Sequence, residues 1–325
     1  MTGIPPFFVC CENPNAPAIG AAGTRKNMAT ALGAMAALAS FEELALSPKP
    51  GLVDPDDCGS HGDMTWVTFL TSASVLAPLW REQAMDGVLH EYYKPSDGLY
   101  VKLRSRGIEM ERKMFAATGG INTHKGLIFA LSILLGAAGS CAARRNLSPG
   151  KICALASEIA RPLVDDDIRR IRDSAKSCQG LTHGERILVE HGIGGIRSEA
   201  ASGFPSALSA LRELEDAVAR GASYRDAALG ALLLLMLISE DTNIIHRSGI
   251  DFWRGEYREE TERAKINFDP LQPKNYLSLL ELNKFLKNHS ASPGGSADLL
   301  ACTLFLYRSK ILGNTLKHSA GRRKR

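Results

Sequence analysis

Apolar residues recur along most of this chain at intervals of three and four positions, the spacing that places them on one face of an α-helix. Residues 206–220 follow this period clearly, while 126–139 and 224–239 are apolar on nearly all sides. Helices that are apolar all round are typical of a buried core. Alternating strand patterns with hairpin turns are hard to find. The pattern therefore predicts an all-α fold.

The predicted helices follow one another without an internal repeat, which favours a single large domain of ten or more helices. They span residues 31–46, 64–80, 104–116, 126–139, 151–160, 166–175, 183–191, 206–220, 224–239, 275–288 and 296–312. We expect this all-helical catalytic domain to cover residues 29–316. Residues 1–28, rich in Pro, Gly, Asn and Ala, are expected to form an N-terminal extension, and residues 317–325 a basic C-terminal tail.

Composition and charge exclude several classes of protein. The 325 residues carry a net charge of +4, too small to indicate nucleic-acid binding. Seven scattered cysteines without a C-x-x-C pair favour neither disulfides nor zinc, and fit a reducing cytoplasm. The longest apolar runs, about 13 residues, are shorter than a membrane span, and residues 1–9 lack the basic start of a secretory signal. We therefore expect a cytoplasmic protein without membrane contact.

Candidate chemistry gathers at the ends of the apolar helices, beginning with Gly119-Gly120-Ile121-Asn122-Thr123-His124-Lys125-Gly126. Asn122 or Thr123 can cap the helix that follows, which places His124 and Lys125 in its first turn. A cation at this positive end of the helix dipole is unfavourable unless an anion binds there too. We therefore predict phosphate binding by these four residues; the alternative is a glycine-rich turn with a solvated lysine.

A second polar segment, residues 47–63, joins two predicted helices. Lys49 supplies a cation, and Asp54, His61 and Asp63 are candidate ligands for Mg²⁺, which prefers carboxylates. Alternatively, Asp63 is only the N-cap of the next helix and Asp54 only a turn residue.

A third segment directly follows the most apolar predicted helix. Its charged side chains are unfavourable beside a buried element unless they are partnered, so Glu240, Asp241 and His246 are candidate catalytic residues. Asn243 and Arg247 are candidate phosphate ligands, and would share one face with Glu240 if the helix continues. The alternative is a solvated helix end.

Two glycine-rich loops complete the set. In residues 192–199, Arg197 could bind phosphate and Glu199 could act as a base, or the two could form a surface pair. In residues 292–298, Gly294 and Gly295 could expose helix N–H groups to a phosphate, with Ser296 as the cap.

Basic groups, carboxylates and helix N-termini together are typical of a polyphosphate site with Mg²⁺. No P-loop, Rossmann fingerprint or nucleophile elbow is present. The residues alone predict an all-α, Mg²⁺-dependent enzyme acting on a nucleotide or another phosphorylated substrate.

At these same segments the chain resembles the triphosphoribosyl-dephospho-CoA synthase family, which serves citrate lyase and malonate decarboxylase. The resembling strings are PKPGLVD (48–54), SHGDM (60–64), GINTHKG (120–126), GIRSEAASGFP (195–205), EDTNIIHRSG (240–249) and SPGGSADLLA (292–301). The resemblance implies that ATP and 3′-dephospho-CoA react to give 2′-(5″-triphosphoribosyl)-3′-dephospho-CoA and adenine. It also implies that the product is later attached to an acyl-carrier subunit, so a downstream holo-acyl-carrier-protein synthase is a possible partner.

Under this hypothesis, Mg²⁺ and three cations hold the triphosphate: Lys49, Lys125 and Arg247. Metal binding, stabilisation of positive charge and proton removal are shared among the carboxylates Asp54, Asp63, Glu199, Glu240 and Asp241. The departing adenine takes a proton from one of the histidines His61, His124 and His246.

Three alternatives stay open at this point. A helical metal-dependent nucleotide phosphohydrolase would release phosphate rather than adenine, although no adjacent His-Asp dyad or E-x-x-E pair is found. A non-enzymatic maturation chaperone would grip the carrier protein without a buried carboxylate cluster. A family relative could transfer the group to a different acceptor alcohol. The many apolar helices also make a homodimer plausible.

Overall fold

The computed structural model describes residues 25–90, 98–175, 181–272 and 276–322, and contains no strand among them. The helices are α1 (Arg25–Ala45), α2 (Trp66–Leu76), α3 (Trp80–Leu89), α4 (Leu99–Ala117), α5 (Lys125–Ala143), α6 (Pro149–Ala175), α7 (His183–His191), α8 (Ile196–Ala201), α9 (Pro205–Ala219), α10 (Tyr224–Ile238), α11 (Thr242–Ser248), α12 (Ile250–Arg254), α13 (Glu256–Asn267), α14 (Leu277–Asn288) and α15 (Gly294–Arg322). The predicted all-α, single-domain fold of more than ten helices is confirmed. Most of the proposed extension 1–28, and the last three residues of the proposed tail, lie outside the described residues.

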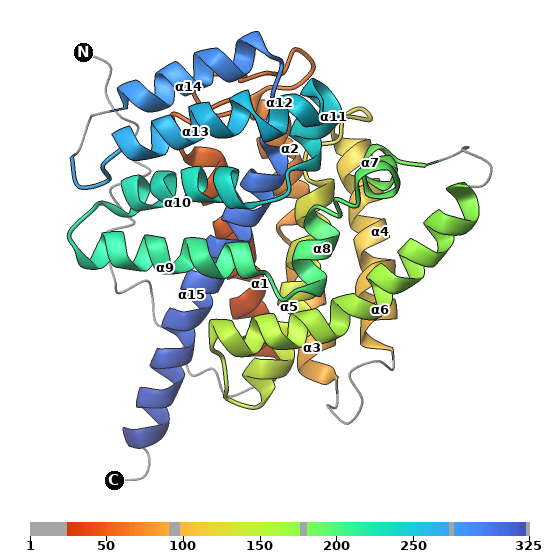
Figure 1. Cartoon of the computed structure of the whole chain (residues 1–325). Coiled ribbons are helices and arrows are strands. Elements are labelled where there is room, and N and C mark those ends of the chain that lie inside the picture. Colours follow the sequence, from red (N-terminus) through yellow and green to blue (C-terminus); the bar gives the residue numbers. More distant parts are fainter. Residues whose placement is uncertain (1–24, 91–97, 176–180, 273–275, 323–325) are drawn as a thin grey trace.

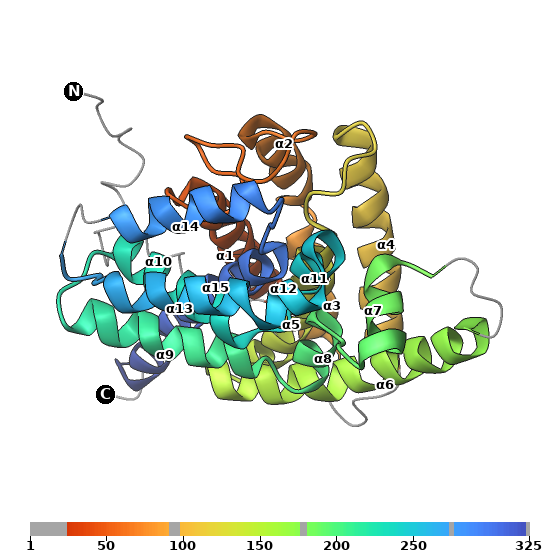
Figure 2. The same cartoon turned by 45° about the horizontal axis from the view of Figure 1, so that its top comes forward.

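Helices α5 and α15 form the centre of the molecule. Helix α5 packs against α1, α3, α4, α6, α8 and α15, and α15 also contacts α9, α10 and α11. Figure 1 shows α15 crossing the middle of the bundle before it extends away on one side, and Figure 2 shows α13 and α14 lying side by side over the same region. The first turns of α5 and α15 therefore lie inside the bundle, where the functional segments meet.

Glycines allow the central helices to approach closely. A Cβ atom on Gly87 of α3 would lie 2.0 Å from the carbonyl oxygen of Gly136 in α5, and one on Gly139 would lie 2.3 Å from that of Ala84. These are backbone contacts that cannot yield, so α3 and α5 meet backbone to backbone. The wall of the core behind the site is therefore rigid.

The expectation that no apolar run reaches the length of a membrane span was wrong for two helices. By length and composition alone, α1 and α5 are long and apolar enough to cross a membrane. A third such span results if the bent pair α10 and α11 is counted as one. Helix α5 has 19 residues rather than 13 because small residues extend it beyond the apolar run. The most apolar stretch of α5 is 83% buried inside the protein, and that of α1 is 56% buried. The apolar surface of α5 is thus used within the core.

Prolines account for two differences from the predicted helices. The helix predicted at 64–80 ends earlier, at Leu76 in α2, because the chain cannot continue as a regular helix into Pro78, and the next helix, α3, was not predicted. Pro162, in contrast, lies inside α6, which joins the two helices predicted at 151–160 and 166–175. A proline therefore ended one helix and was accommodated in another.

Helix caps also differ from the sequence-based expectation. Thr65, not Asp63, caps α2 through a reciprocal capping box with Thr68. Ser296 lies within the first turn of α15 and does not cap it. Asn122 accepts the backbone N–H of Lys125 (3.2 Å), so this predicted contact with the start of α5 is present, although His124 is the N-cap residue.

The chain bends by 65° between α10 and α11. Helix α10 ends at Ile238, and α11 begins at Thr242 with Asp241 as its N-cap. The helix does not continue through this segment, so Glu240 does not share a helical face with Asn243 and Arg247. The bend places Asp241 at the centre of the fold.

Candidate functional site

The first turns of α5, α11 and α15 meet at the centre of the molecule. A Cβ atom added to Gly126 in α5 would lie 2.0 Å from Oδ2 of Asp298 in α15. One added to Gly295 would lie 3.1 Å from Oδ1 of Asp241, the N-cap of α11. Helix ends that are far apart in the sequence are therefore in contact, as expected if helix ends converge.

Asp241 caps two of these helices at once. Its Oδ1 accepts the N–H of Asn243 (3.0 Å), and its Oδ2 accepts both the N–H (2.9 Å) and the hydroxyl (3.1 Å) of Ser296. The residue is fully buried. Burial raises the pKa of Asp241, while the hydrogen bonds from Ser296 and Asn243 oppose that change. Asp241 therefore joins the starts of α11 and α15.

Two further carboxylates hold helix N-termini in the same way. Oε2 of Glu240 accepts the N–H groups of Gly194 (3.1 Å) and Gly195 (3.2 Å), directly before α8. Glu199 accepts the N–H (2.7 Å) and the hydroxyl (3.0 Å) of Ser206 in the first turn of α9. Burial raises the pKa of Glu199, and the charge of Glu240 adds to this. Both carboxylates thus organise the glycine-rich loop.

Asp298 is the carboxyl group at the start of α5. It accepts a hydrogen bond from the backbone of Leu127 and lies against Gly126. Burial raises the pKa of Asp298 well above its ordinary value, and the charges of Glu43 and Asp241 raise it further. The sequence analysis did not single out Asp298 as a site residue, since the helix dipole alone favours a carboxylate near a helix N-terminus. The helix N-termini that were predicted to face a phosphate are therefore occupied by carboxylates of the protein.

Lys49 lies in the core rather than at a surface for phosphate. Its Nζ lies 2.6 Å from Oε1 of Glu43, and both side chains are buried. Its backbone N–H donates to Oδ2 of Asp54 (2.9 Å), whose Oδ1 accepts the N–H groups of Asp56 and Asp57, each at 2.8 Å. Asp54 is thus the residue that closes its own loop.

The three candidate metal ligands do not form a common site. Nε2 of His61 lies 2.8 Å from the hydroxyl of Ser292, and its Nδ1 lies 3.7 Å from Asp63, whose side chain is 64% exposed. Burial, and then the charge of Arg247, lower the pKa of His61. Within the described ranges, no group of three or more His, Cys, Asp or Glu side chains is arranged to hold a metal ion. Asp54, His61 and Asp63 therefore do not fit a protein cage for Mg²⁺.

His124 is a core histidine. Its Nδ1 lies 2.7 Å from the hydroxyl of Ser72 and 3.2 Å from that of Thr123, and its buried Nε2 has no hydrogen-bond partner among the described residues. Burial, with the charge of Lys49, lowers the pKa of His124 to about 3. The imidazole is therefore neutral at pH 7, and Thr123 contacts it rather than a ligand.

Arg247 is used to hold two loops together. Its guanidinium donates to the carbonyl oxygens of Ser290 (2.8 Å) and Ser60 (2.6 Å). Nearby, a Cβ atom on Gly294 would lie 3.0 Å from Nδ2 of Asn243, so this glycine keeps the start of α15 close to α11. Both predicted phosphate ligands, Arg247 and Gly294, have structural partners.

A pocket of about 670 Å³ opens beside this cluster, between α4, α5, α7, α8 and α11. This volume lies in the range of small-molecule sites. Five of the predicted site residues line it: Asn122, Lys125, Arg197, Asn243 and His246. The sequence missed other polar residues of the lining: Arg104, Glu111, Ser132, Thr182, His183 and Glu185. Gly126 also lines the pocket, so the pocket adjoins the carboxylate cluster at the start of α5.

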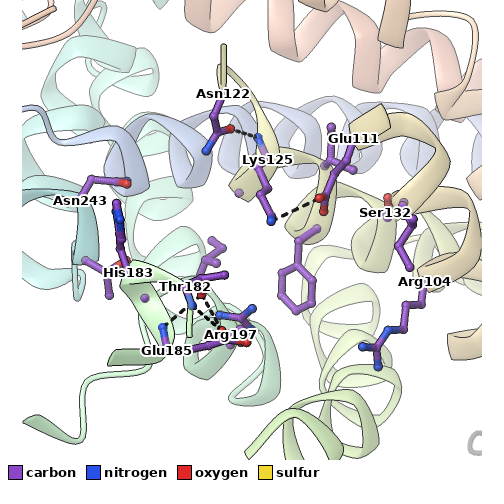
Figure 3. A pocket seen from close by; sticks show the side chains of 18 of the residues that line it. Arg104, Glu111, Asn122, Lys125, Ser132, Thr182, His183, Glu185, Arg197 and Asn243 are labelled. Carbon is purple, nitrogen blue, oxygen red and sulfur yellow. Dashed lines mark hydrogen bonds and ion pairs between the residues drawn. The ribbon is translucent and has the colours of Figure 1, made fainter. Parts of the chain in front are cut away.

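The α4–α5 side of the pocket is partly apolar and carries one ion pair. Nζ of Lys125 lies 3.4 Å from Oε2 of Glu111, and Figure 3 shows the two side chains pointing toward each other across the gap between their helices. Apolar side chains continue this wall: Leu103, Ile108, Phe115, Ile128, Phe129 and Ile133. An apolar surface next to a lysine suits a ligand with an aromatic base and a charged tail.

The opposite side carries two stacked histidines. The rings of His183 in α7 and His246 in α11 lie with centroids 3.5 Å apart and an interplanar angle of 33°. Burial, followed by the charges of His183, Arg247 and Arg186, lowers the pKa of His246. The lowered pKa favours the neutral form of His246.

Helix α7 is fixed at this position by a capping box that the sequence contains. Thr182 and Glu185 bind reciprocally, with the N–H of Thr182 donating to Oε2 of Glu185 (2.7 Å), as Figure 3 shows. The T-x-x-E spacing at the start of a predicted helix is a known signature of such a cap. It could have directed attention to His183, which lies between the two residues.

Comparisons with known proteins identify the family of this chain. The sequence profile of the ATP:dephospho-CoA triphosphoribosyl transferase family matches residues 29–315. A relative from Streptococcus mutans serotype c, named "Probable 2-(5″-triphosphoribosyl)-3′-dephosphocoenzyme-A synthase", is 36% identical over 87% of this chain and 97% of its own length. Relatives of the same name from Streptococcus equi subsp. zooepidemicus and Streptococcus pyogenes serotype M1 are 38% and 35% identical, over 83% and 88% of this chain and 94% and 99% of their own. This chain is a transferase that belongs to the ATP:dephospho-CoA triphosphoribosyl transferase family.

Proposed function

We propose that the protein transfers the triphosphoribosyl group of ATP to the ribose 2′-hydroxyl of 3′-dephospho-CoA and releases adenine. The observation that carries this proposal is the pocket of about 670 Å³, whose lining residues all lie within the part of the chain that matches the family, residues 29–315. Its apolar wall can receive a purine, and its cationic groups can receive a polyphosphate. The product would be the prosthetic-group precursor of an acyl-carrier protein.

The reaction breaks the bond between C1″ and adenine N9 and forms a bond between C1″ and the attacking oxygen. Positive charge develops on the ribose as the base departs. The site must therefore stabilise that charge, protonate the leaving adenine and accept a proton from the attacking hydroxyl. The triphosphate stays intact and serves as a handle for binding.

Lys125 and Arg197 are the predicted cations that line the pocket, and Asn122 and Asn243 lie beside them. We assign the triphosphate to these four side chains. Lys49 is buried against Glu43 and therefore acts in the proposal only through the shape of its loop.

His246 is the proposed donor of the proton to adenine. It lines the pocket, whereas His61 is bonded to Ser292 outside the lining and His124 is buried in the core. Burial, followed by the charge of His183, lowers the pKa of His246, which makes its imidazolium a stronger acid.

Glu199, Glu240 and Asp241 act in the proposal as positioning residues, because their oxygens hold the N-termini of α8, α9, α11 and α15. Mg²⁺ remains part of the proposal as the counter-ion of ATP, since Mg²⁺ usually binds through substrate phosphates and water with few protein ligands. A cytoplasmic location, a homodimer and a downstream holo-acyl-carrier-protein synthase also remain proposals.

Mass spectrometry of the purified protein with ATP, 3′-dephospho-CoA and Mg²⁺ tests the reaction. We expect one free adenine for each triphosphoribosyl product. Adenine release that does not depend on 3′-dephospho-CoA would indicate another acceptor or hydrolysis. Phosphate or pyrophosphate without adenine would replace the proposal with the phosphohydrolase.

A further inference from the structure

The carboxyl group of Asp298 differs from the other carboxylates at the helix N-termini. Both oxygens of Asp241 and of Glu199 accept hydrogen bonds from the helices they cap. Asp298 has one such contact, from the backbone of Leu127. It is only half-buried and forms no ion pair with any residue that the structure describes. Asp298 therefore retains an oxygen that can bind a proton or a substrate.

The position of this carboxyl group is fixed by a glycine of the pocket. Oδ2 of Asp298 lies so close to Gly126 that a Cβ atom there would be 2.0 Å away. Gly126 lines the pocket next to Lys125. Asp298 is not itself among the lining residues. Because position 126 has no side chain, its carboxyl group lies directly against Gly126, which does line the pocket beside Lys125, where we place the triphosphoribosyl group.

We propose that Asp298 accepts the proton of the attacking ribose hydroxyl; this inference rests on the transfer reaction proposed above. The O2′–H bond breaks and its proton goes to the carboxylate of Asp298, while the oxygen's electron pair forms the bond to C1″. The C1″–N9 bond breaks, and its electron pair leaves with adenine, which takes a proton from His246. No other reactant is needed.

Burial and the charges around Asp298 increase the affinity of its carboxylate for a proton. Glu43 from α1 and Asp241 before α11 both raise its pKa, in addition to burial. Lys49 is paired with Glu43. Burial raises the pKa of the Cys302 thiol, one turn further along α15, and the charge of Asp298 adds to this. A base is most efficient when its pKa lies near the working pH.

The substitution Asp298→Asn tests the proposal because the amide oxygen can still accept the N–H of Leu127. We expect kcat for the triphosphoribosyl product to fall at least about 100-fold, with a melting temperature close to that of the wild type. The acidic limb of the kcat/KM profile should disappear in this variant. Asp251→Asn, at an exposed Asp in the first turn of α12, is the matched control and should leave both readings unchanged.

A second variant tests the same role without relying on the first. Asp298→Ala opens space beside Gly126, and added formate should restore part of the activity. An Asn variant that keeps more than a third of the wild-type kcat and its acidic limb would overturn the inference. If neither variant folds, a wild-type kcat/KM that stays constant down to the ordinary carboxyl pKa of about 4 would overturn it. A wild-type protein that forms no triphosphoribosyl product would instead contradict the proposed function.

Discussion

The carboxylate cluster at the helix N-termini and the wall of the pocket contain the same kinds of residue, but use them differently. In the cluster, Asp241 and Glu199 are bonded on both oxygens to helix N–H and hydroxyl groups. At the pocket wall, Lys125 is 44% exposed and faces Glu111 at 3.4 Å, a weak pair that a ligand could open. A polar residue at the end of an apolar helix can therefore serve the fold or the ligand, and only its partners show which.

This comparison separates the expected effects of substitution. Changes in the buried cluster should reduce the free energy of unfolding. Changes at the pocket wall should reduce catalysis or binding while leaving the melting temperature unchanged.

The largest effect is expected for Glu43→Ala, which leaves Lys49 charged and buried without its partner. Removing one member of a buried ion pair typically costs about 3–5 kcal/mol of unfolding free energy. Urea unfolding measures this loss of unfolding free energy. The control is Glu215→Ala, whose lysine partner Lys310 is 45% exposed, and which should lose about 0–1 kcal/mol. Equal losses in the two variants would contradict the buried pair.

His246→Asn should lower kcat about 100-fold through loss of the proton donor, without changing the melting temperature, because the side chain is exposed. Adenine release measured by chromatography provides the reading. His191→Asn, at the other end of α7 and outside the pocket lining, is the control. A variant at position 246 with normal turnover would remove this histidine from the mechanism.

His124 should make stability depend on pH. Its pKa of about 3 lies below that of the unfolded chain, so between pH 6.5 and 3 the unfolded state binds a proton that the folded state does not. Stability is therefore lost as the pH falls, by about 2 kcal/mol between pH 6.5 and 5 from this group. His124→Gln should flatten the curve in urea unfolding at several pH values, and His191→Gln should not. An unchanged slope at position 124 would mean that the buried ring is not responsible.

Lys125→Ala should raise the KM for ATP about tenfold, or about 1.4 kcal/mol, because one cation facing the triphosphate is lost. Initial rates of adenine release at varied ATP concentration measure the change. Lys113→Ala is the matched control. Lys113 is similarly exposed and is paired with Glu109 one turn earlier in α4, and it lies outside the pocket lining. The assignment fails if both variants bind ATP equally well.

The hydrophobic pattern was sufficient for the fold because helical periodicity is a local property. Residues 183–191 were predicted at their observed bounds, and the apolar stretch at 126–139 is the core of α5. The predicted helix 64–80 ran through Pro78, although the proline itself indicates the observed break, whereas the continuation through Pro162 depends on packing around α6.

The candidate site was predicted less completely, because its function depends on contacts between distant segments. The sequence identified the segments that meet, but could not show that Asp241 bonds Ser296 or that Asp298 lies over Gly126. His183 and Glu111 lie on helices without a recognisable sequence motif, and only the fold brings them to the pocket. The sequence also could not show that His124 is buried in the core rather than exposed at the surface, where it could act on a ligand.

The central position of α15 has a consequence for the order in which the site is completed during synthesis. Asp241 finds its partner Ser296 only 55 residues later, and the first turn of α15 also supplies Asp298. Until that helix emerges from the ribosome, the growing chain exposes the apolar groove that α15 will fill, together with carboxylates that lack their donors. Docking of α15 thus acts as a late step of assembly, and we expect a chain that stops before it to be neither stable nor active.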